Sequence, residues 1–182
     1  MTGSLVSVVG SKDSGKTLTV ELLIEKLTRR GYRVAAMKHV PEPGFTIDTL
    51  GKDTWRYASA GAATIVSVAS DEIATIEKLD TKNLLLKDIL QRCRGVDFIL
   101  LEGLKRLVSQ DPDVPKIVTV KSTGEAYEAI ETFSPLIAFA GIRPMEILNI
   151  DIPYINLLKN TDEIADIVEK YVGERRKPDL ED

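Results

Sequence analysis

The apolar positions of the chain fall into two patterns, short continuous runs and stretches in which apolar residues recur every three or four positions. Runs bounded by turn residues predict strands, and the three-to-four spacing predicts helices that bury one face. The expected strands cover residues 5–9, 33–37, 64–69, 72–77, 98–101, 117–120, 136–140 and 154–157. The expected helices cover residues 20–27, 52–60, 86–93, 125–133 and 160–172.

The order of these elements predicts the fold class. Strands and helices alternate along most of the chain, which is typical of α/β proteins with a mainly parallel sheet flanked by helices. Residues 98–101 are apolar throughout, as expected for a central parallel strand buried on both faces. Only Ser70 and Asp71 separate the β-rich runs 64–69 and 72–77, which predicts a hairpin extension.

Length and composition indicate a single folded domain. The 182 residues are 43% apolar and 29% charged, a balance typical of globular proteins. We expect one domain over residues 1–172 and a charged, flexible tail over residues 173–182. The apolar runs are far shorter than the roughly 18–20 residues that a membrane-spanning helix needs, and residues 5–9 lack the basic flank of a signal peptide. A cytoplasmic protein without membrane contact is therefore expected.

Charge and metal-ligand content narrow the possible partners. The 24 basic and 28 acidic side chains give a net charge of −4, which argues against an electrostatic hold on nucleic acid. A single cysteine, Cys93, and a single histidine, His39, exclude an internal disulfide and a His/Cys metal cage. An anionic ligand must therefore be held by a local site.

The strongest local signal is the segment GSKDSGKT at residues 10–17, which we call the glycine-rich loop. It matches G-x-x-x-x-G-K-[ST] directly after an expected strand and before an expected helix. In such a loop, backbone N–H groups point at phosphate oxygens and the helix N-terminus adds partial positive charge. Lys16 would neutralise the β- and γ-phosphates, and the Thr17 hydroxyl would ligate Mg²⁺. The expected phosphate site comprises Gly10, Ser11, Lys12, Asp13, Ser14, Gly15, Lys16 and Thr17.

A second acid is expected at the carboxyl end of a neighbouring parallel strand, because that edge of the sheet carries the ligand. Asp97 and Glu102 bracket the apolar run 98–101, so they lie roughly 17 Å apart at about 3.3 Å per residue. Only Glu102 reaches the phosphate edge, and we expect it to serve Mg²⁺. Lys105 follows closely and is interpreted either as an anion contact or as a solvated side chain.

The segment between residues 38 and 61 follows the second expected strand to the same edge of the sheet. Asp48 is a candidate to orient the attacking water or to bind Mg²⁺ through water, with a plain loop or capping role as the alternative. Arg56 is a candidate ligand contact, although Asp53 and Arg56 at i and i+3 also fit a surface ion pair on a helix. His39 is interpreted as a proton carrier, a ligand or a structural residue.

In combination, these segments resemble the MobB family, molybdopterin-guanine dinucleotide biosynthesis protein B. The likeness is carried by GSKDSGKT, KH, IDTLGKDTWRYASAGA, DFILLEGLK and PKI, in this order. It implies a P-loop NTPase fold that binds GTP, a homodimer, and weak Mg²⁺-dependent GTPase activity. It also implies a supporting role beside the guanylyltransferase MobA, which attaches GMP to molybdopterin. Molybdopterin or its guanine dinucleotide is then an expected ligand.

The resemblance also assigns residues. Gly10, Gly15, Lys16 and Thr17 would bind phosphates, Glu102 would serve magnesium, and the block from Asp48 to Arg56 would face the cofactor side. Leu18 stands where family members commonly have threonine, so its backbone N–H alone would meet the α-phosphate. The N-K-x-D pattern that reads guanine does not occur in the sequence, so the preference for GTP is implied by the resemblance only.

Two other functions share the same loop. A small-molecule kinase usually carries an arginine-rich lid over the transferred phosphoryl group. The candidate lid, residues 104–115, contains Lys105 and Arg106 but also Asp111 and Asp113. A nucleotide-dependent scaffold without useful turnover is the other alternative.

Overall fold

The computed structural model of the chain describes residues 3–145 and 150–176. Contacts within the chain divide it into two compact units. One unit comprises residues 1–39 and 86–182 and is called the sheet unit, and the other comprises residues 40–85 and is called the hairpin unit. The expectation of one nucleotide-binding domain over residues 1–172 stays a prediction.

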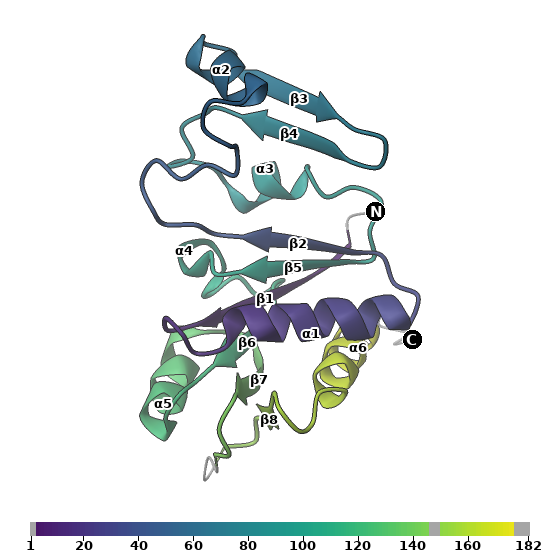
Figure 1. The fold of residues 1–182 in the computed structure, drawn as a ribbon. Coiled ribbons are helices and arrows are strands. Elements are labelled where there is room, and N and C mark those ends of the chain that lie inside the picture. Colours follow the sequence, from purple (N-terminus) through teal and green to yellow (C-terminus); the bar gives the residue numbers. More distant parts are fainter. Residues whose placement is uncertain (1–2, 146–149, 177–182) are drawn as a thin grey trace, which may run out of the picture. The chain divides into compact units, whose positions relative to one another are not determined.

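The described residues of the sheet unit form a six-stranded sheet in the order β2-β5-β1-β6-β7-β8, in which every paired strand is parallel (Figure 1). Strand β1 lies between β5 and β6, which are distant in the sequence. The loop that leaves β1 therefore meets groups from both neighbours at the carboxyl edge of the sheet. The strands are β1 Ser4–Gly10, β2 Val34–Lys38, β5 Phe98–Glu102, β6 Lys116–Thr119, β7 Leu136–Gly141 and β8 Tyr154–Asn156.

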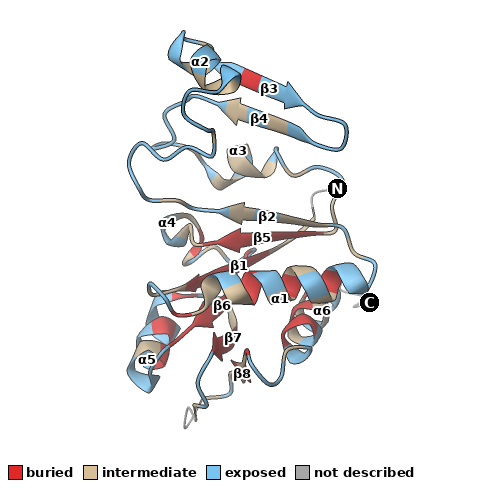
Figure 2. Ribbon diagram, in the orientation of Figure 1, coloured by how far each residue is buried: buried red, intermediate tan, exposed pale blue. Residues whose placement is uncertain are grey.

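Helices cover both faces of this sheet, which gives the three layers that the sequence predicts. Residues of β5 alternate between the faces: Phe98 and Leu100 pack with residues of α1 (Lys16–Arg29) and α6 (Glu163–Arg176). Ile99 and Leu101 pack with residues of α4 (Lys105–Val108) and α5 (Thr123–Thr132), and α3 (Leu86–Leu90) packs against the same cluster. All of β5 is buried (Figure 2). Complete burial of a leucine or isoleucine side chain contributes about 1.5–3 kcal/mol, so this strand is a main source of stability.

The hairpin unit contains α2 (Asp53–Ser59) and the antiparallel strands β3 (Thr64–Val68) and β4 (Ile73–Glu77). Thr64 pairs with Glu77 and Val68 with Ile73, and the Ala69 N–H donates a 2.8 Å hydrogen bond to the Glu72 carbonyl across the turn. The predicted hairpin extension is therefore present.

Helices α4 and α6 (Glu163–Arg176) differ most from the sequence prediction. Helix α4 was not expected, because its four residues are too few to show helical periodicity. Helix α6 begins at Glu163 rather than Asn160, and it includes residues 173–176, which were assigned to the tail. The Asn160 side chain still donates a 2.9 Å hydrogen bond to the Glu163 carboxylate. The rest of the predicted tail, residues 177–182, lies outside the described residues. Within the described part of the chain, none of the helices has the length and apolarity needed to cross a membrane.

Candidate functional site

The glycine-rich loop joins the end of β1 to the first residue of α1. Gly10 lies against the neighbouring strand, because a Cβ atom at this position would overlap both oxygens of Thr119. Gly15 has a φ of 101°, in the left-handed region that glycine adopts without a steric penalty. The first glycine of the motif thus permits close approach to β6, and the second turns the chain into α1.

A chain of hydroxyl groups holds the loop on the sheet. Ser14 is 1% exposed, and its Oγ donates a 2.8 Å hydrogen bond to the Ser11 carbonyl. The same Oγ accepts a 2.6 Å hydrogen bond from the Thr119 hydroxyl, whose Oγ1 also lies 3.2 Å from the Val9 carbonyl oxygen. Because the Ser14 hydroxyl is used in this way, the part of Ser14 left for a ligand is its backbone N–H.

Lys16 folds back over the loop. Its ammonium donates a 2.5 Å hydrogen bond to the Ser11 carbonyl. Burial lowers the pKa of Lys16, the nearby Glu102 carboxylate raises it, and the positive charge of Lys105 lowers it further. The Lys16 ammonium thus lies over the loop, where a bound polyanion would favour its protonated form.

Glu102 is the last residue of β5, in register with Val8 of β1 and with Lys38 of β2. It is 8% exposed, and its Oε1 accepts a 3.0 Å hydrogen bond from the Thr17 hydroxyl. The Lys38 ammonium lies 2.9 Å from the same Oε1 and donates to Thr17 Oγ1 at 3.3 Å. These three side chains form a closed triangle at the start of α1.

The two candidate acids lie at opposite ends of β5. Asp97 Oδ2 accepts a 2.8 Å hydrogen bond from the Arg33 backbone N–H and lies 3.5 Å from Arg33 Nε. Asp97 is thus engaged at the edge of the sheet away from the loop, whereas Glu102 is directly beside Thr17.

The spacing of Thr17 and Glu102 suits magnesium. Neighbouring oxygens of an octahedral Mg²⁺ site lie about 2.9–3.0 Å apart, which follows from Mg–O distances of about 2.0–2.1 Å. Thr17 Oγ1 and Glu102 Oε1 are 3.0 Å apart. Mg²⁺ in nucleotide sites usually takes one or two carboxylates and completes its shell with phosphate oxygens and water. The donor set of Thr17 and Glu102 fits this pattern.

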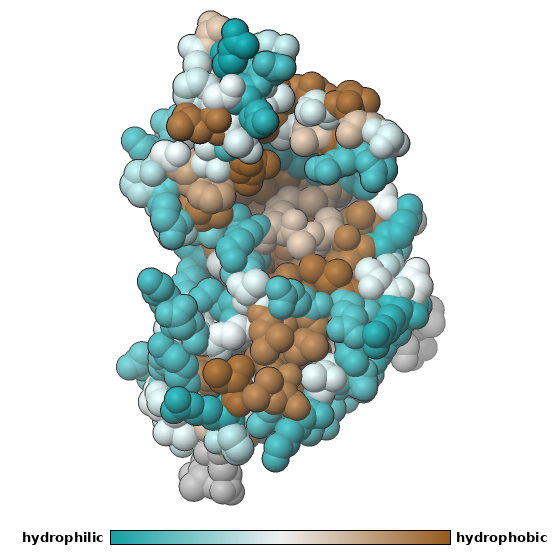
Figure 3. All heavy atoms as spheres, in the orientation of Figure 1, coloured by the Kyte–Doolittle hydropathy of each residue, from teal (hydrophilic) through white to brown (hydrophobic). Residues whose placement is uncertain are grey.

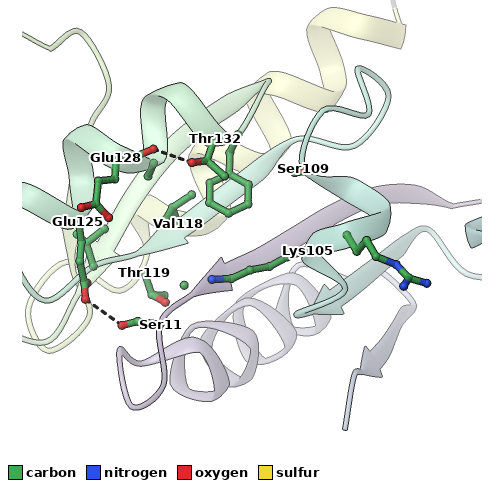
Figure 4. Close-up of a pocket in the computed structure, with 13 residues that line it drawn as sticks. Ser11, Lys105, Ser109, Val118, Thr119, Glu125, Glu128 and Thr132 are labelled. Carbon is green, nitrogen blue, oxygen red and sulfur yellow. Dashed lines mark hydrogen bonds between the residues drawn. The ribbon is translucent and has the colours of Figure 1, made fainter. Parts of the chain in front are cut away.

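The chain turns sharply after Glu102. Gly103 has a φ of 87° and Leu104 a φ of 57°, and the left-handed conformation costs a non-glycine residue about 1–2 kcal/mol. A Cβ atom on Gly103 would lie 3.2 Å from His39 Cβ, so glycine fits this close approach. The turn starts α4 at Lys105, whose ammonium points toward Thr119 and the loop (Figure 4).

Glu125 in the first turn of α5 fastens the loop from the other side. Its Oε1 accepts a 3.1 Å hydrogen bond from the Ser11 hydroxyl, and its Oε2 accepts a 2.7 Å bond from the Lys121 backbone N–H. The Lys121 ammonium donates to the Lys12 carbonyl at 3.0 Å. The turn between β6 and α5 is therefore bonded to two residues of the loop.

Asp48 and Arg56 belong to the hairpin unit, and the structure shows their local contacts. Asp48 Oδ1 accepts hydrogen bonds from the Thr49 N–H at 2.9 Å and the Thr54 hydroxyl at 2.7 Å. Arg56 forms a 3.5 Å ion pair with Asp53, and their side chains are 70% and 77% exposed. These contacts match the capping and surface-pair alternatives, and the catalytic and ligand roles of the two residues stay predictions.

The sheet unit brings the other candidate residues together around the loop, among them Lys16, Thr17, Glu102 and Lys105. Lys12 and Asp13 are exposed on the loop, and Leu18 is half-buried against the core. The sequence analysis did not assign Thr119, Lys121 or Glu125 to the site. Ser122 and Glu125 have capping-box spacing, and the Glu125 N–H does donate to the Ser122 hydroxyl at 3.3 Å. The sequence analysis began this helix at Glu125 instead of Thr123, and the contact of the carboxylate with Ser11 was not predicted.

A parallel sheet with helices on both faces and this loop between β1 and α1 define a P-loop NTPase fold. The family model "Molybdopterin guanine dinucleotide synthesis protein B" matches residues 5–141. The chain belongs to the MobB family.

Relatives and solved structures agree with this assignment. The chain is 33% identical over 120 residues to a putative molybdopterin-guanine dinucleotide biosynthesis adapter protein from Methanocaldococcus jannaschii, a match covering 64% of this chain and 47% of the relative. It is 31% identical over 128 residues to a probable adapter protein of the same name from Bacillus subtilis, covering 70% of each chain. The chain thus spans about half the length of the archaeal relative.

The fold is shared with two solved structures. A MobB homologue from Bacillus stearothermophilus superposes with a TM-score of 0.68 at 21% identity, covering 93% of this chain and 99% of that one. MobB of Bacillus subtilis superposes with a TM-score of 0.69 at 24% identity, and the match covers 90% of this chain and 97% of that one.

Proposed function

We propose that this protein binds GTP with Mg²⁺ at the glycine-rich loop and serves as an accessory protein in the formation of molybdopterin guanine dinucleotide. The observation that carries the proposal is the convergence of Lys16, Thr17 and Glu102 on one loop at the carboxyl edge of the sheet. Lys16 lies over the loop, and Thr17 and Glu102 have the 3.0 Å spacing of Mg²⁺ ligands.

Each residue has a distinct task in this proposal. The loop N–H groups and the Lys16 ammonium hold the phosphates, and the backbone N–H of Leu18 meets the α-phosphate. Thr17 and Glu102 hold Mg²⁺, which when bound neutralises charge on the β- and γ-phosphate oxygens. Lys105 is the additional cation at the γ-phosphate end. Because Glu102 is already engaged by Thr17 and Lys38, it is a poor general base, which supports slow hydrolysis.

The adapter role requires contact with other proteins, and we propose a homodimer that assists a MobA-like guanylyltransferase in the cytoplasm. The hairpin unit supports this through large exposed apolar side chains: Ile47 is 75%, Leu50 77% and Val68 75% exposed. Hydrophobic residues gather along the β3–β4 hairpin (Figure 3). Exposed apolar clusters of this kind mark protein interfaces.

The test is nucleotide binding and hydrolysis with GTP against ATP, with and without molybdopterin and a MobA-like enzyme. We expect Mg²⁺-dependent binding that favours GTP, slow turnover, and faster formation of the dinucleotide by the partner enzyme. Equal affinity for ATP would contradict guanine selectivity. Phosphate transfer to a small acceptor would indicate the kinase alternative, and light scattering of the purified chain measures the dimer directly.

A further inference from the structure

The base of the proposed nucleotide lies on the side of the loop that carries the α-phosphate, because the nucleoside is attached there. In that proposal the α-phosphate meets the backbone N–H of Leu18, in the first turn of α1. The proposed Mg²⁺ ligand Glu102 belongs to β5, on one side of β1, whereas β6, β7 and β8 lie on the other (Figure 1). Leu18 packs against the buried cluster that contains Leu157, the residue after β8. The base therefore extends toward the ends of β7 and β8.

The cavity between α4 and α5 is the other space beside the loop. It has a volume of about 390 Å³ and borders the loop at Ser11 (Figure 4). The apolar residues of its lining, such as Val118, are buried in the core and offer a ring little surface. Glu125 and Glu128 add carboxylates to the lining, which repel a phosphate. Leu18 follows the other end of the loop, so the cavity does not receive the base.

Two exposed apolar side chains lie at the ends of β7 and β8. Ile142 follows β7 and is 44% exposed, and Leu158, in the second position after β8, is 68% exposed. A Cβ atom on Gly15 would lie 3.7 Å from Ile142 and 3.2 Å from Leu157, so the segments after both strands border the start of α1. The Leu157 N–H donates a 2.9 Å hydrogen bond to the Gly141 carbonyl, which keeps these two segments side by side.

Tyr154, the first residue of β8, fixes the segment that carries Ile142. Its hydroxyl donates a hydrogen bond to the Arg143 carbonyl. A Cβ atom on Gly141 would overlap this hydroxyl, so the glycine at the end of β7 lets the tyrosine reach across to Arg143. Burial raises the pKa of Tyr154, which keeps the hydroxyl protonated and able to donate. The chain after β7 is therefore held in place beside α1.

We propose that the purine base packs on Leu18, Ile142 and Leu158, and that Tyr154 is a positioning residue for this contact. The inference rests on the proposed function, because it extends the nucleotide site from the phosphates to the base. The faces of a purine ring carry no hydrogen-bonding groups, so apolar side chains that they cover are removed from water. Leu18 adds to this apolar surface at the position where family members commonly have threonine.

The experiment compares GTP with inorganic tripolyphosphate, which occupies the loop but has no base. Calorimetry at saturating Mg²⁺ measures the affinity of the full chain for each. Ile142→Ala should weaken GTP binding by about fivefold or more and leave tripolyphosphate binding unchanged. Ile130→Ala is the matched control, because Ile130 is 39% exposed on α5, and this variant should bind both ligands as wild type does.

Tyr154→Phe tests the positioning role. The change removes the hydrogen bond to Arg143 and keeps the ring, so the ratio of GTP affinity to tripolyphosphate affinity should fall by about threefold or more. Tyr171→Phe is the control. Tyr171 lies on α6 near Ser4, the first residue of β1, at the edge of the sheet away from the loop, and its variant should keep the ratio.

The outcomes separate this proposal from the proposed function. Equal losses for GTP and tripolyphosphate in Ile142→Ala would show that Ile142 supports the loop, and would overturn the base contact. Wild-type GTP affinity in this variant would overturn it as well, as would a wild-type chain that binds tripolyphosphate as tightly as GTP. An unchanged ratio in Tyr154→Phe would overturn the role of Tyr154. A wild-type chain that binds neither ligand would overturn the proposed function instead.

Discussion

The ammonium of Lys38 lies 2.9 Å from the Glu102 carboxylate, across a register pair that joins β2 to β5. The carboxylate that is proposed to serve Mg²⁺ is thus already neutralised by a side chain of the protein. Mg²⁺ and Lys38 compete for one oxygen atom, Glu102 Oε1.

The Lys38 contact predicts a change in magnesium requirement. Lys38→Met removes the competing cation, so the Mg²⁺ concentration that gives half-maximal GTP binding should fall by about three- to tenfold, or about 0.7–1.4 kcal/mol. A titration with Mg²⁺ at a fixed concentration of GTP measures this half-maximal Mg²⁺ concentration. Lys170→Met, at an exposed position on α6, is the matched control and should behave as wild type. An unchanged or higher requirement would show that Lys38 supports the site rather than competing with Mg²⁺.

Lys16→Ala should abolish triphosphate binding without unfolding the protein. The side chain lies over the loop and donates to the Ser11 carbonyl, so its removal deletes a phosphate contact and leaves the buried face of α1 intact. Calorimetry gives the affinity, and circular dichroism checks the fold. A natively folded variant with wild-type affinity would eliminate the loop as the nucleotide site.

Glu102→Gln and Asp97→Asn, compared side by side, separate the two acids. Glu102→Gln keeps the shape of the side chain but removes the charge, so hydrolysis should slow by about tenfold or more, while nucleotide binding measured at saturating Mg²⁺ changes little. Asp97→Asn, at the other end of β5, should leave turnover unchanged. A larger turnover defect in the Asp97 variant would mean that the wrong acid has been assigned to Mg²⁺.

Binding of a polyphosphate should weaken at alkaline pH. Burial lowers the pKa of Lys16 below its usual value of 10.5, with Glu102 opposing this shift and Lys105 adding to it. A bound polyanion favours the charged lysine, so affinity is complete below the pKa of the free protein and falls as pH rises through it. The fall should therefore begin below pH 10.5. Inorganic tripolyphosphate is the probe because it lacks the guanine base, which itself titrates at alkaline pH. Lys16→Arg should remove the part of the alkaline fall in affinity that comes from Lys16. An affinity independent of pH up to 10.5 would contradict this sign.

Arg56→Lys tests the ligand role expected for the hairpin unit. The Arg56 side chain is 70% exposed, and a guanidinium holds phosphate through two parallel hydrogen bonds where lysine makes a point contact. If Arg56 contacts molybdopterin, the variant should bind it about tenfold more weakly and keep its GTP affinity. Wild-type affinity for both ligands would show that Arg56 does not contact molybdopterin. Its role would then be the surface ion pair with Asp53, which contributes about a few tenths of a kcal/mol.

Short sequence patterns predicted the buried strand and the glycine-rich loop, because each of these features is encoded by residues that are close together in the sequence. The apolar run 98–101 placed a buried strand, and the position of Glu102 at its carboxyl end put this residue at the edge of the sheet that carries the glycine-rich loop. The glycine spacing of residues 10–17 predicted a loop that the backbone angles of Gly15 and the close approach at Gly10 explain.

What sequence reasoning missed depends on which strands are neighbours. Lys38 meets Glu102 because β2 lies next to β5, a pairing over a long stretch of chain that no short pattern encodes. Thr119 reaches Ser14 for the same reason, since β6 flanks β1. The end of α6 was misplaced because its apolar periodicity stops at Val172, whereas the backbone continues as a helix to Arg176.

The glycine-rich loop and the cavity beside it are built from different elements of the sheet unit. The glycine-rich loop is held mainly by strand ends, through Thr119 and Glu102, whereas the cavity beside it is walled largely by the short α4 and by α5. Substitutions on those helices that keep Glu125, which also bonds Ser11, change the shape of the cavity and leave the contacts of Thr119 and Glu102 with the loop in place. The cavity can therefore change shape while the strand ends keep the glycine-rich loop in place.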